Sequence, residues 1–210
     1  MLVEICCDSL EAAREAAGAG ADRIELCADL PCGGITPPHE VLDEAVTLGV
    51  PVNVLIRPRG GDFVYGDSEI HHILFNIAYC GNAGANGVVI GALTDDGRID
   101  MPLCRDIVDM ARSYGLSITF HRAIDCAADI MEALDDVLSL GVDRVLTSGG
   151  AASAPEGCRT IRKMVERAAG KAIILPGAGI TAENAKELIE FTGVTEIHGS
   201  RIELAKLYGI

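Results

Sequence analysis

The segment Gly20-Ala-Asp-Arg-Ile-Glu-Leu26 carries the pattern that decides the fold. A glycine suited to a left-handed helix stop is followed by a short polar turn and then by an apolar run typical of a buried strand. The same pattern returns in three further segments, which begin at Gly84, Gly141 and Gly193. Ordinary helix-to-strand loops would also produce it, but its position before every second predicted strand favours a ring of repeated units.

Short β-rich runs alternate with longer helical runs along the chain. The predicted strands are Leu2–Cys6, Arg23–Leu26, Val52–Ile56, Gly87–Ile90, Ser117–Phe120, Arg144–Thr147, Ile173–Leu175 and Glu196–His198. The predicted helices are Ser9–Ala17, Pro38–Leu48, Asp67–Asn82, Met101–Ser113, Ile130–Leu140, Pro155–Ala169, Thr181–Thr192 and a short Arg201–Tyr208.

Strict alternation of strand and helix predicts parallel strands joined by right-handed crossovers. Eight such strands close into a (β/α)₈ TIM barrel, and a doubly wound open sheet is the alternative. No linker-like change of composition divides residues 1–210, so we expect a single domain.

The charge and hydropathy of the chain exclude some classes of binding partner. The net charge is −14, and no run of Lys and Arg forms the basic patch that nucleic-acid binding needs. The sequence shows neither a signal-peptide pattern nor an apolar run long enough to span a membrane, so we expect a cytoplasmic protein without membrane contact. The eight cysteines have no disulfide-framework spacing and are expected to be free thiols. Small molecules, metals and other proteins remain as partners.

Side chains alternate faces along a strand, and this predicts which residues enter the barrel. In Arg23–Leu26 the two apolar residues face the helices, which turns Arg23, Glu25 and Cys27 inward. The same reasoning places further residues in the lumen, namely Glu4, Cys6, Asn53, Leu55, Arg57, Thr119, His121, Glu196, His198 and Ser200. Buried charges must be paired, so the inward glutamates are expected to meet Arg23, Arg57 and Arg144. Such a network would serve the fold alone where it lies low on the strands.

The loop Ile56-Arg-Pro-Arg-Gly-Gly-Asp-Phe63 follows the third predicted strand. Its arginines, Arg57 and Arg59, suit the bidentate capture of a carboxylate or phosphate. The alternative is that they pair with acidic loop residues such as Asp8, Asp29 or Asp62.

His121 is expected at the inward-facing end of the fifth strand, followed by Arg122 and Asp125. A histidine beside a carboxylate can move protons near neutral pH, and the candidate partners are Glu25 and Asp62. The hypothetical catalytic set is therefore Glu25, Arg57, His121 and Asp62, and a satisfied core histidine is the alternative.

Glycine-rich turns follow the later predicted strands, where TIM barrels often hold phosphate on backbone N–H groups. Ser148-Gly-Gly150 is one of these turns, and Leu175-Pro-Gly-Ala-Gly-Ile180 is another. Plain tight turns would use the same glycines. The candidate anion-binding residues are Arg57, Arg59, Arg122, Gly177, Gly179 and Ser200.

Cys6 and Cys27 are both predicted to point inward at the ends of neighbouring strands, which lie about 4.8 Å apart. Two soft thiolates at that separation would hold Cu(I) in near-linear coordination. Two small buried apolar residues, or a disulfide, are the alternatives.

Several motifs resemble the CutC family of copper homeostasis proteins. They include Val3-Glu-Ile-Cys-Cys-Asp-Ser9, Gly20-Ala-Asp-Arg-Ile-Glu-Leu-Cys27, Gly33-Gly-Ile-Thr-Pro37, Ile56-Arg-Pro-Arg-Gly-Gly-Asp-Phe63, Thr119-Phe-His-Arg-Ala123, Arg144-Val-Leu-Thr-Ser-Gly-Gly150, Pro176-Gly-Ala-Gly179 and Glu196-Ile-His-Gly-Ser200. The resemblance extends from residue 1 to about residue 201.

This resemblance implies a cytoplasmic TIM barrel that forms a homodimer or higher oligomer and takes part in copper tolerance. It also implies that Cys6 and Cys27 are Cu(I) ligands. Cys7 stands where the family often has Val, and Ala178 where it often has Gly. The alternative function is an enzyme acting on a small anionic substrate that bears a phosphate or carboxylate group.

Overall fold

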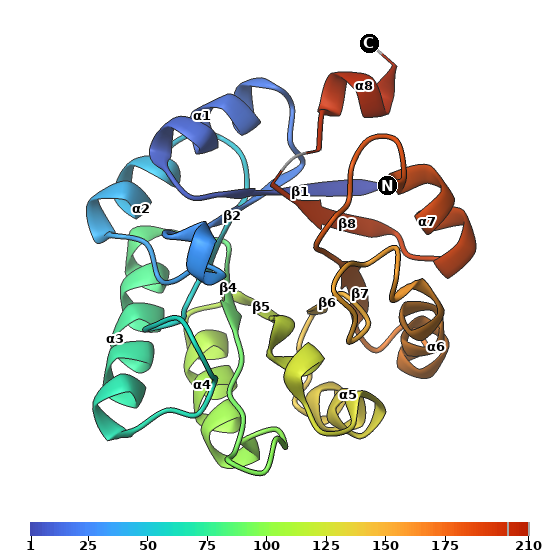
Figure 1. Ribbon diagram of the computed structural model, residues 1–210. Helices are drawn as coiled ribbons and strands as arrows, with labels where there is room; N and C mark the ends of the chain where they lie inside the picture. The colour runs from blue at the N-terminus through green and yellow to red at the C-terminus, as the bar shows by residue number, and fades with distance from the viewer. Residues whose placement is uncertain (201, 210) are drawn as a thin grey trace.

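The computed structural model describes residues 1–200 and 202–209 and shows a barrel of eight parallel strands inside a ring of helices (Figure 1). The strands are β1 (Leu2–Cys7), β2 (Arg23–Leu26), β3 (Val52–Leu55), β4 (Gly87–Ile90), β5 (Ser117–Phe120), β6 (Arg144–Thr147), β7 (Ile173–Pro176) and β8 (Glu196–Gly199). The predicted strands and the TIM-barrel fold are thus confirmed, with strand ends that differ by one residue at most.

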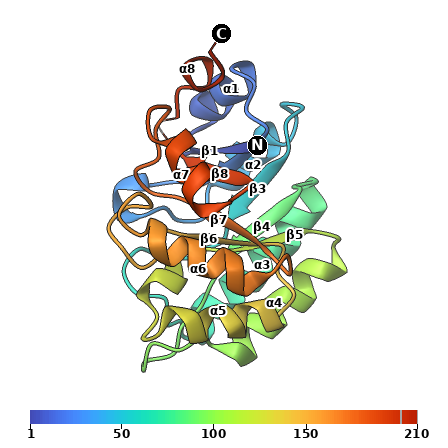
Figure 2. The ribbon, with the colours of Figure 1, turned by 90° about the vertical axis from the view of Figure 1, so that its right-hand side faces the viewer.

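Hydrogen-bonded pairing follows the chain from β7 back to β1 and then joins β1 to β8. β7 and β8 lie side by side, but within the described residues no strand ladder joins them, so the barrel is nearly closed. Helices α6 (Cys158–Ala168) and α7 (Ala185–Thr192) cover the outer face of this junction (Figure 2).

The remaining helices complete the outer layer. They are α1 (Leu10–Gly18), α2 (His39–Ala45), α3 (Asp67–Ala83), α4 (Met101–Ser113), α5 (Ile130–Ser139) and α8 (Leu204–Tyr208), with short 3₁₀ helices η1 (Leu30–Cys32) and η2 (Arg122–Cys126) that the sequence did not predict. Within the described residues, no helix has the length and apolar character needed to cross a membrane.

Helices α2, α6 and α7 are each four residues shorter than predicted, and α5 is one residue shorter. Before α7, Asn184 accepts a hydrogen bond from the N–H of Thr181 at 2.9 Å and donates one to the carbonyl of Gly179 at 2.9 Å. This side-chain turn occupies the residues that were predicted as the first helical turn, because Asn competes well with the backbone for such bonds. The predicted short helix begins at Leu204, and its first predicted residue, Arg201, lies outside the described residues.

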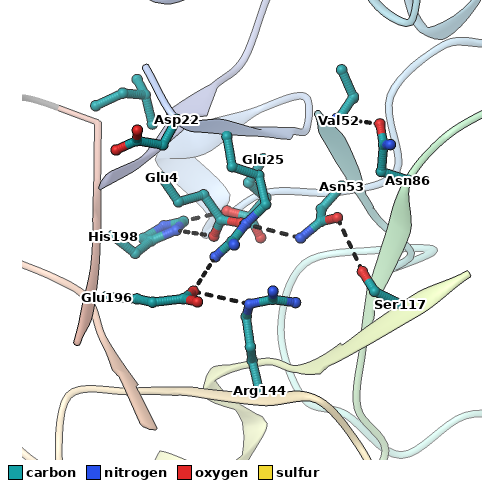
Figure 3. A network of polar contacts seen from close by, with 12 residues as sticks. Glu4, Asp22, Glu25, Val52, Asn53, Asn86, Ser117, Arg144, Glu196 and His198 are labelled. Carbon is teal, nitrogen blue, oxygen red and sulfur yellow. Dashed lines mark hydrogen bonds and ion pairs between the residues drawn. The ribbon is translucent and has the colours of Figure 1, made fainter. Parts of the chain in front are cut away.

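The repeated turn has a physical function. Its four glycines all have positive φ, between 72° and 86°. The polar residue two positions later caps a neighbouring strand: the Asp22 carboxylate accepts the N–H of Val3 at 2.8 Å. Asn86 does the same for β3 (Figure 3), and Asp143 does so for β5. In this motif the glycine therefore ends a helix, and the polar residue two positions later fixes the start of the adjoining strand.

The main apolar core lies between the strands and the helices and contains Val3, Ile24, Val54 and Cys7. Cys7 faces the helices, as predicted. The opposite strand face is polar low in the barrel. Near its mouth a small separate cluster forms from Cys27, Leu55 and Val89, with Cys6 and Leu30 packed against it.

Candidate functional site

A network of paired charges lies in the lower lumen (Figure 3). Arg23 donates to the carboxylate of Glu4 and to that of Glu196, the second bond measuring 2.6 Å. Arg144 donates to Glu196 at 2.9 Å, and the Asn53 amide donates to Glu4 at 3.2 Å. The predicted pairing of Glu4 and Glu196 with inward arginines is therefore observed.

His198 connects this network to the mouth of the barrel (Figure 3). Its Nδ1 lies 2.8 Å from a Glu4 oxygen, and its Nε2 lies 3.3 Å from a Glu25 oxygen. Glu25 was predicted to meet an arginine and instead meets this histidine, because His198 projects into the lumen from β8, which is separated from β2 only by β1. Alternation along β8 predicts that inward direction, but the histidine was not among the predicted catalytic residues.

Burial and neighbouring charge act in opposite directions on these groups. Burial alone would raise the pKa of Glu4, but His198 and Arg23 outweigh it and lower that pKa to about 2. Burial lowers the pKa of His198, and the carboxylates of Glu25 and Glu4 more than reverse this, so the net shift is upward. Burial raises the pKa of Glu25, and His198 opposes the rise only in part. Glu4 is therefore ionised, and its carboxylate accepts a hydrogen bond from the Nδ1–H of His198.

Above the network, a cavity of about 820 Å³ opens at the C-terminal ends of the strands. Eight of the predicted site residues line it: Cys6, Glu25, Cys27, Arg57, His121, Arg122, Gly179 and Ser200. His198, Asp8 and Phe63 line it as well. The predicted residues Arg59, Asp62 and Gly177 do not.

The thiols of Cys6 and Cys27 face each other on one wall of this cavity, with their sulfur atoms 3.7 Å apart. Both are free, and neither is bonded as a disulfide. The hydrogen bond to Cys27, followed by burial and the negative charge of Glu25, raises the pKa of Cys6 well above its ordinary value. In the absence of a cation the Cys6 thiol therefore keeps its proton at neutral pH.

His121 is buried at the end of β5, as predicted, but within the described residues its side chain has no hydrogen bond or ion pair with Glu25 or Asp62. Its Nδ1 accepts the N–H of Ala123 at 3.2 Å, which places the ring proton on Nε2. Within the described residues this Nε2 has no hydrogen-bond partner. Burial, assisted by the charge of Arg57, lowers the pKa of His121 to about 3, so the ring is neutral at physiological pH.

The Arg57 side chain connects the turn around η1 to the loop after β3 by hydrogen bonds. Its guanidinium donates to the carbonyls of Cys32, Gly34 and Gly61 at 3.3, 3.1 and 2.7 Å. The same group lies 4.7 Å from the centre of the Phe63 ring. These contacts fix the loop after β3 against the turn around η1, while the Arg57 side chain still forms part of the cavity wall.

Arg59 and Asp62 lie outside the main cavity and pair with each other. Arg59 donates to Asp62 at 2.8 Å and to Glu69 of α3 at 2.6 Å. The Asp62 side chain is 69% exposed. Of the two predictions for this loop, the pairing with an acidic neighbour is the one that the structure shows for Arg59.

An internal carboxylate occupies the glycine-rich turn after β6. Asp125 accepts the N–H groups of Ser148 at 2.9 Å and Gly150 at 3.0 Å, and Arg122 donates to it at 2.9 Å. These are the backbone groups that would hold a phosphate in an anion-binding turn. Because Asp125 already uses them, the turn is anchored to η2.

The turn after β7 is different. Ala178 and Gly179 both have left-handed backbone angles, with φ of 71° and 74°. Within the described residues, the N–H groups of Gly179 and Ile180 have no hydrogen-bond partner. Gly177 serves packing, since a Cβ there would lie 2.7 Å from Leu146 and 3.1 Å from the His198 ring.

The fold and the cavity together define a TIM-barrel protein with thiol, carboxylate and imidazole groups gathered at the C-terminal ends of its strands. The family model that describes the CutC family matches residues 1–203. The chain belongs to the CutC family.

A human and a bacterial relative match most of this chain, and the name of the human one refers to copper. The copper homeostasis protein cutC homolog of Homo sapiens is 47% identical over 200 residues, which cover 95% of this chain and 72% of that protein. The family protein CutC of Vibrio campbellii is 43% identical over 197 residues, or 93% of this chain and 80% of that protein.

Solved structures agree on the fold. The crystal structure of CutC from Streptococcus agalactiae has a TM-score of 0.90 and 33% identity, and the match covers 96% of this chain and 99% of that one. A deoxyribose phosphate aldolase from Aeropyrum pernix has a TM-score of 0.70 at 16% identity, covering 99% and 88% of the two chains, and this likeness concerns the fold alone.

Proposed function

We propose that this chain is a copper homeostasis protein that binds Cu(I) as its cargo through Cys6 and Cys27. The observation that carries the proposal is the pair of free thiols, whose sulfur atoms lie 3.7 Å apart on the wall of an open cavity. Soft sulfur ligands select Cu(I), which accepts two-coordinate geometry. The names of the human and mouse relatives point to the same metal.

The surroundings of the thiol pair suit a weakly solvated ion with few ligands. Leu55 and Val89 pack beside Cys27 and are almost completely buried, so the thiols have an apolar wall behind them. The cavity in front of them supplies a route of entry. A bound cation would replace the thiol protons, because the thiolate is the form that binds metal.

Titration of the reduced protein with Cu(I) against a competing chelator tests this proposal. We expect one ion per wild-type chain and none in the Cys6→Ser/Cys27→Ser variant, because serine removes both soft ligands. Cys126→Ser is the matched control, since it removes an exposed thiol outside the main cavity. Unchanged stoichiometry and affinity in the double variant would contradict the proposal.

A second candidate function is an enzyme that acts on a small anionic substrate in the same cavity. The observation in its favour is the Nε2–H of His121, a buried donor of fixed tautomer without a partner among the described residues. In this hypothesis the neutral His121 polarises an oxygen of the substrate, Glu25 moves the proton, and the turn at Gly179 holds the anion. Crystals soaked with inorganic phosphate give density beside Gly179 if this is correct, and an empty cavity at high phosphate contradicts it.

We also propose that the chain acts in the cytoplasm as a single domain and as a homodimer. All eight cysteines are free, which suits a reducing compartment. Phe75 on α3 is 61% exposed and lies near the stacked rings of His39 and Tyr79, which gives the outer helices an aromatic surface for a second copy. Sedimentation of the purified protein distinguishes a dimer from a monomer.

A further inference from the structure

We propose that the cavity contains a second metal site, in which Cys6, Glu25 and His198 bind a divalent cation of the Zn²⁺ type. One ligand atom from each of these residues lies within 4.8 Å of the other two, and all three residues are largely shielded from solvent. This inference goes beyond Cu(I) binding and does not depend on it.

The topology of the barrel brings these ligands together. Cys6 is on β1, Glu25 is its register partner on β2, and His198 is on β8, the other neighbour of β1. A thiolate, an imidazole and a carboxylate from three adjoining strands form a three-ligand set of the kind that catalytic zinc sites use. Only a small closing movement is needed, since Nε2 of His198 already lies 3.3 Å from Glu25.

The orientation of His198 is the second observation. Its Nδ1 lies 2.8 Å from Glu4, which in turn contacts Arg23 and Asn53, so the ring is held from behind. This leaves Nε2 as the nitrogen that faces Cys6 and Glu25. Histidines that bind metals are typically fixed in this way by a carboxylate on their other nitrogen.

The charge and type of the ligands distinguish this site from the Cys6–Cys27 copper site. A thiolate and a carboxylate together carry a charge of −2, which a divalent cation neutralises, and the carboxylate and imidazole suit Zn²⁺ whereas two soft thiolates suit Cu(I). Cys27 does not belong to the three-ligand group, although its sulfur lies 3.7 Å from that of Cys6. The two sites therefore share Cys6, and occupation of one excludes occupation of the other.

The open side of the site faces the cavity of about 820 Å³. Three protein ligands leave a fourth tetrahedral position free, which a water molecule or an oxygen of a bound small molecule can take. His121, whose buried Nε2–H has no hydrogen-bond partner among the described residues, also lines this cavity. The site thus belongs to the class that binds an oxygen-bearing ligand through an open metal position.

Co²⁺ is the probe for this site, because tetrahedral thiolate-bound Co²⁺ gives strong visible bands and a sulfur-to-metal charge-transfer band. The reduced full-length protein is titrated with Co²⁺ and then with Zn²⁺ as competitor. We expect one tetrahedral Co²⁺ per chain with the charge-transfer band, displaced by one equivalent of Zn²⁺. A weak octahedral Co²⁺ spectrum without a charge-transfer band in the wild-type protein would overturn the inference.

Variants assign the ligands and separate the two sites. Glu25→Gln and His198→Gln should weaken Co²⁺ binding on the order of 100-fold, the upper range for disturbing a metal environment, while Cu(I) binding is kept. Cys27→Ser should lose Cu(I) and keep the Co²⁺ spectrum, and Cys6→Ser should lose both. Asp8→Asn, which changes a carboxylate of the same cavity outside the group, is the matched control.

The outcomes distinguish this inference from the copper proposal. If the wild-type protein binds no Cu(I) but gives the tetrahedral Co²⁺ spectrum, the copper proposal alone is contradicted. Co²⁺ affinity that is unchanged in both Glu25→Gln and His198→Gln overturns the divalent site alone. Circular dichroism establishes that each variant is folded before it is titrated, and Glu25→Gln provides the ligand test if His198→Gln is unfolded.

Discussion

The lower lumen and the mouth of the barrel are both lined by polar side chains, yet these are organised differently. Low in the barrel, Arg23 lies between the carboxylates of Glu4 and Glu196, and Arg144 pairs with the second of these. At the mouth, the two facing thiols bond mainly to each other, and Nε2 of His121 has no partner among the described residues. Charges that satisfy one another support a fold, whereas groups left without partners are available to a ligand.

His198 belongs to both regions and shows how one depends on the other. Its Nδ1 contacts Glu4 below, and its Nε2 contacts Glu25 above. The lower network therefore acts as a rigid base that sets the direction of a side chain in the cavity. This arrangement predicts large stability effects for changes below and small ones for changes above.

The largest effect is expected for Glu4→Gln. Glu4 is 1% exposed and contacts Arg23, His198 and Asn53, so the variant leaves the buried guanidinium of Arg23 with less compensation. Breaking a buried ion pair in this way costs about 3–5 kcal/mol. Urea unfolding at neutral pH measures the loss, and circular dichroism checks the native fold.

Glu44→Gln is the control for this prediction, because Glu44 pairs with Arg14 on the surface at 2.7 Å, with both side chains more than half exposed. Exposed pairs contribute about 0–1 kcal/mol. If Glu4→Gln were no more destabilising than Glu44→Gln, the charge network of the lower lumen would not stabilise the fold.

The second effect concerns pH and the mouth of the barrel. Because the pKa of His121 is about 3 in the folded protein and near 6.5 when unfolded, His121 contributes stability that is present above pH 6.5. That contribution is lost as the pH falls from 6.5 toward 3, by about 2 kcal/mol between pH 7 and pH 5 at roughly 1.4 kcal/mol per pKa unit. His121→Asn keeps an acceptor near Ala123 but cannot be protonated, so its unfolding free energy should fall less over this range.

Urea unfolding of wild type and His121→Asn at pH 7, 6 and 5 tests the difference. The comparison between the two proteins isolates His121 from Glu4, whose pKa is also lowered and which acts in the same direction at lower pH. His198 and Glu25, whose pKa values are raised, act in the opposite direction in both proteins. Parallel stability curves would show that His121 is not the buried neutral histidine described here.

The sequence predicted the barrel well because its signals are local. Gly20 and Asp22 each act within a few residues or on the neighbouring strand, so their spacing reports the backbone directly. Strand alternation likewise predicted the inward direction of Cys6, Glu25 and His198, because that direction depends only on the pleat.

The pairing of long side chains was less predictable, because it depends on distances that spacing does not give. Asp62 was a candidate partner for His121, but its carboxylate turns back to Arg59, three residues away. Glu25 meets His198 rather than an arginine. Asp125 lies near His121 in the sequence, yet it caps the turn at Gly150, and this contact needs both the 3₁₀ helix η2 and the end of β6 in place.

The smallest expected effect compares two strained alanines, one on the outer surface and one at the mouth of the barrel. Ala169 ends α6 with φ of 48° and is exposed, whereas Ala178 lies at the mouth with φ of 71°. A left-handed backbone costs an L-residue roughly 1–2 kcal/mol, and glycine relieves it at the expense of unfolded-state entropy. Ala169→Gly and Ala178→Gly should therefore each raise the free energy of unfolding by about 0.5–1 kcal/mol. Because Gly179 and Ile180 line the cavity and their N–H groups have no hydrogen-bond partner within the described residues, Ala178→Gly, which loosens this turn, should also weaken phosphate binding there, measured by titration calorimetry, while Ala169→Gly leaves it unchanged. A loss of stability in Ala178→Gly, beside a gain in Ala169→Gly, would mean that contacts at the mouth require the alanine methyl group.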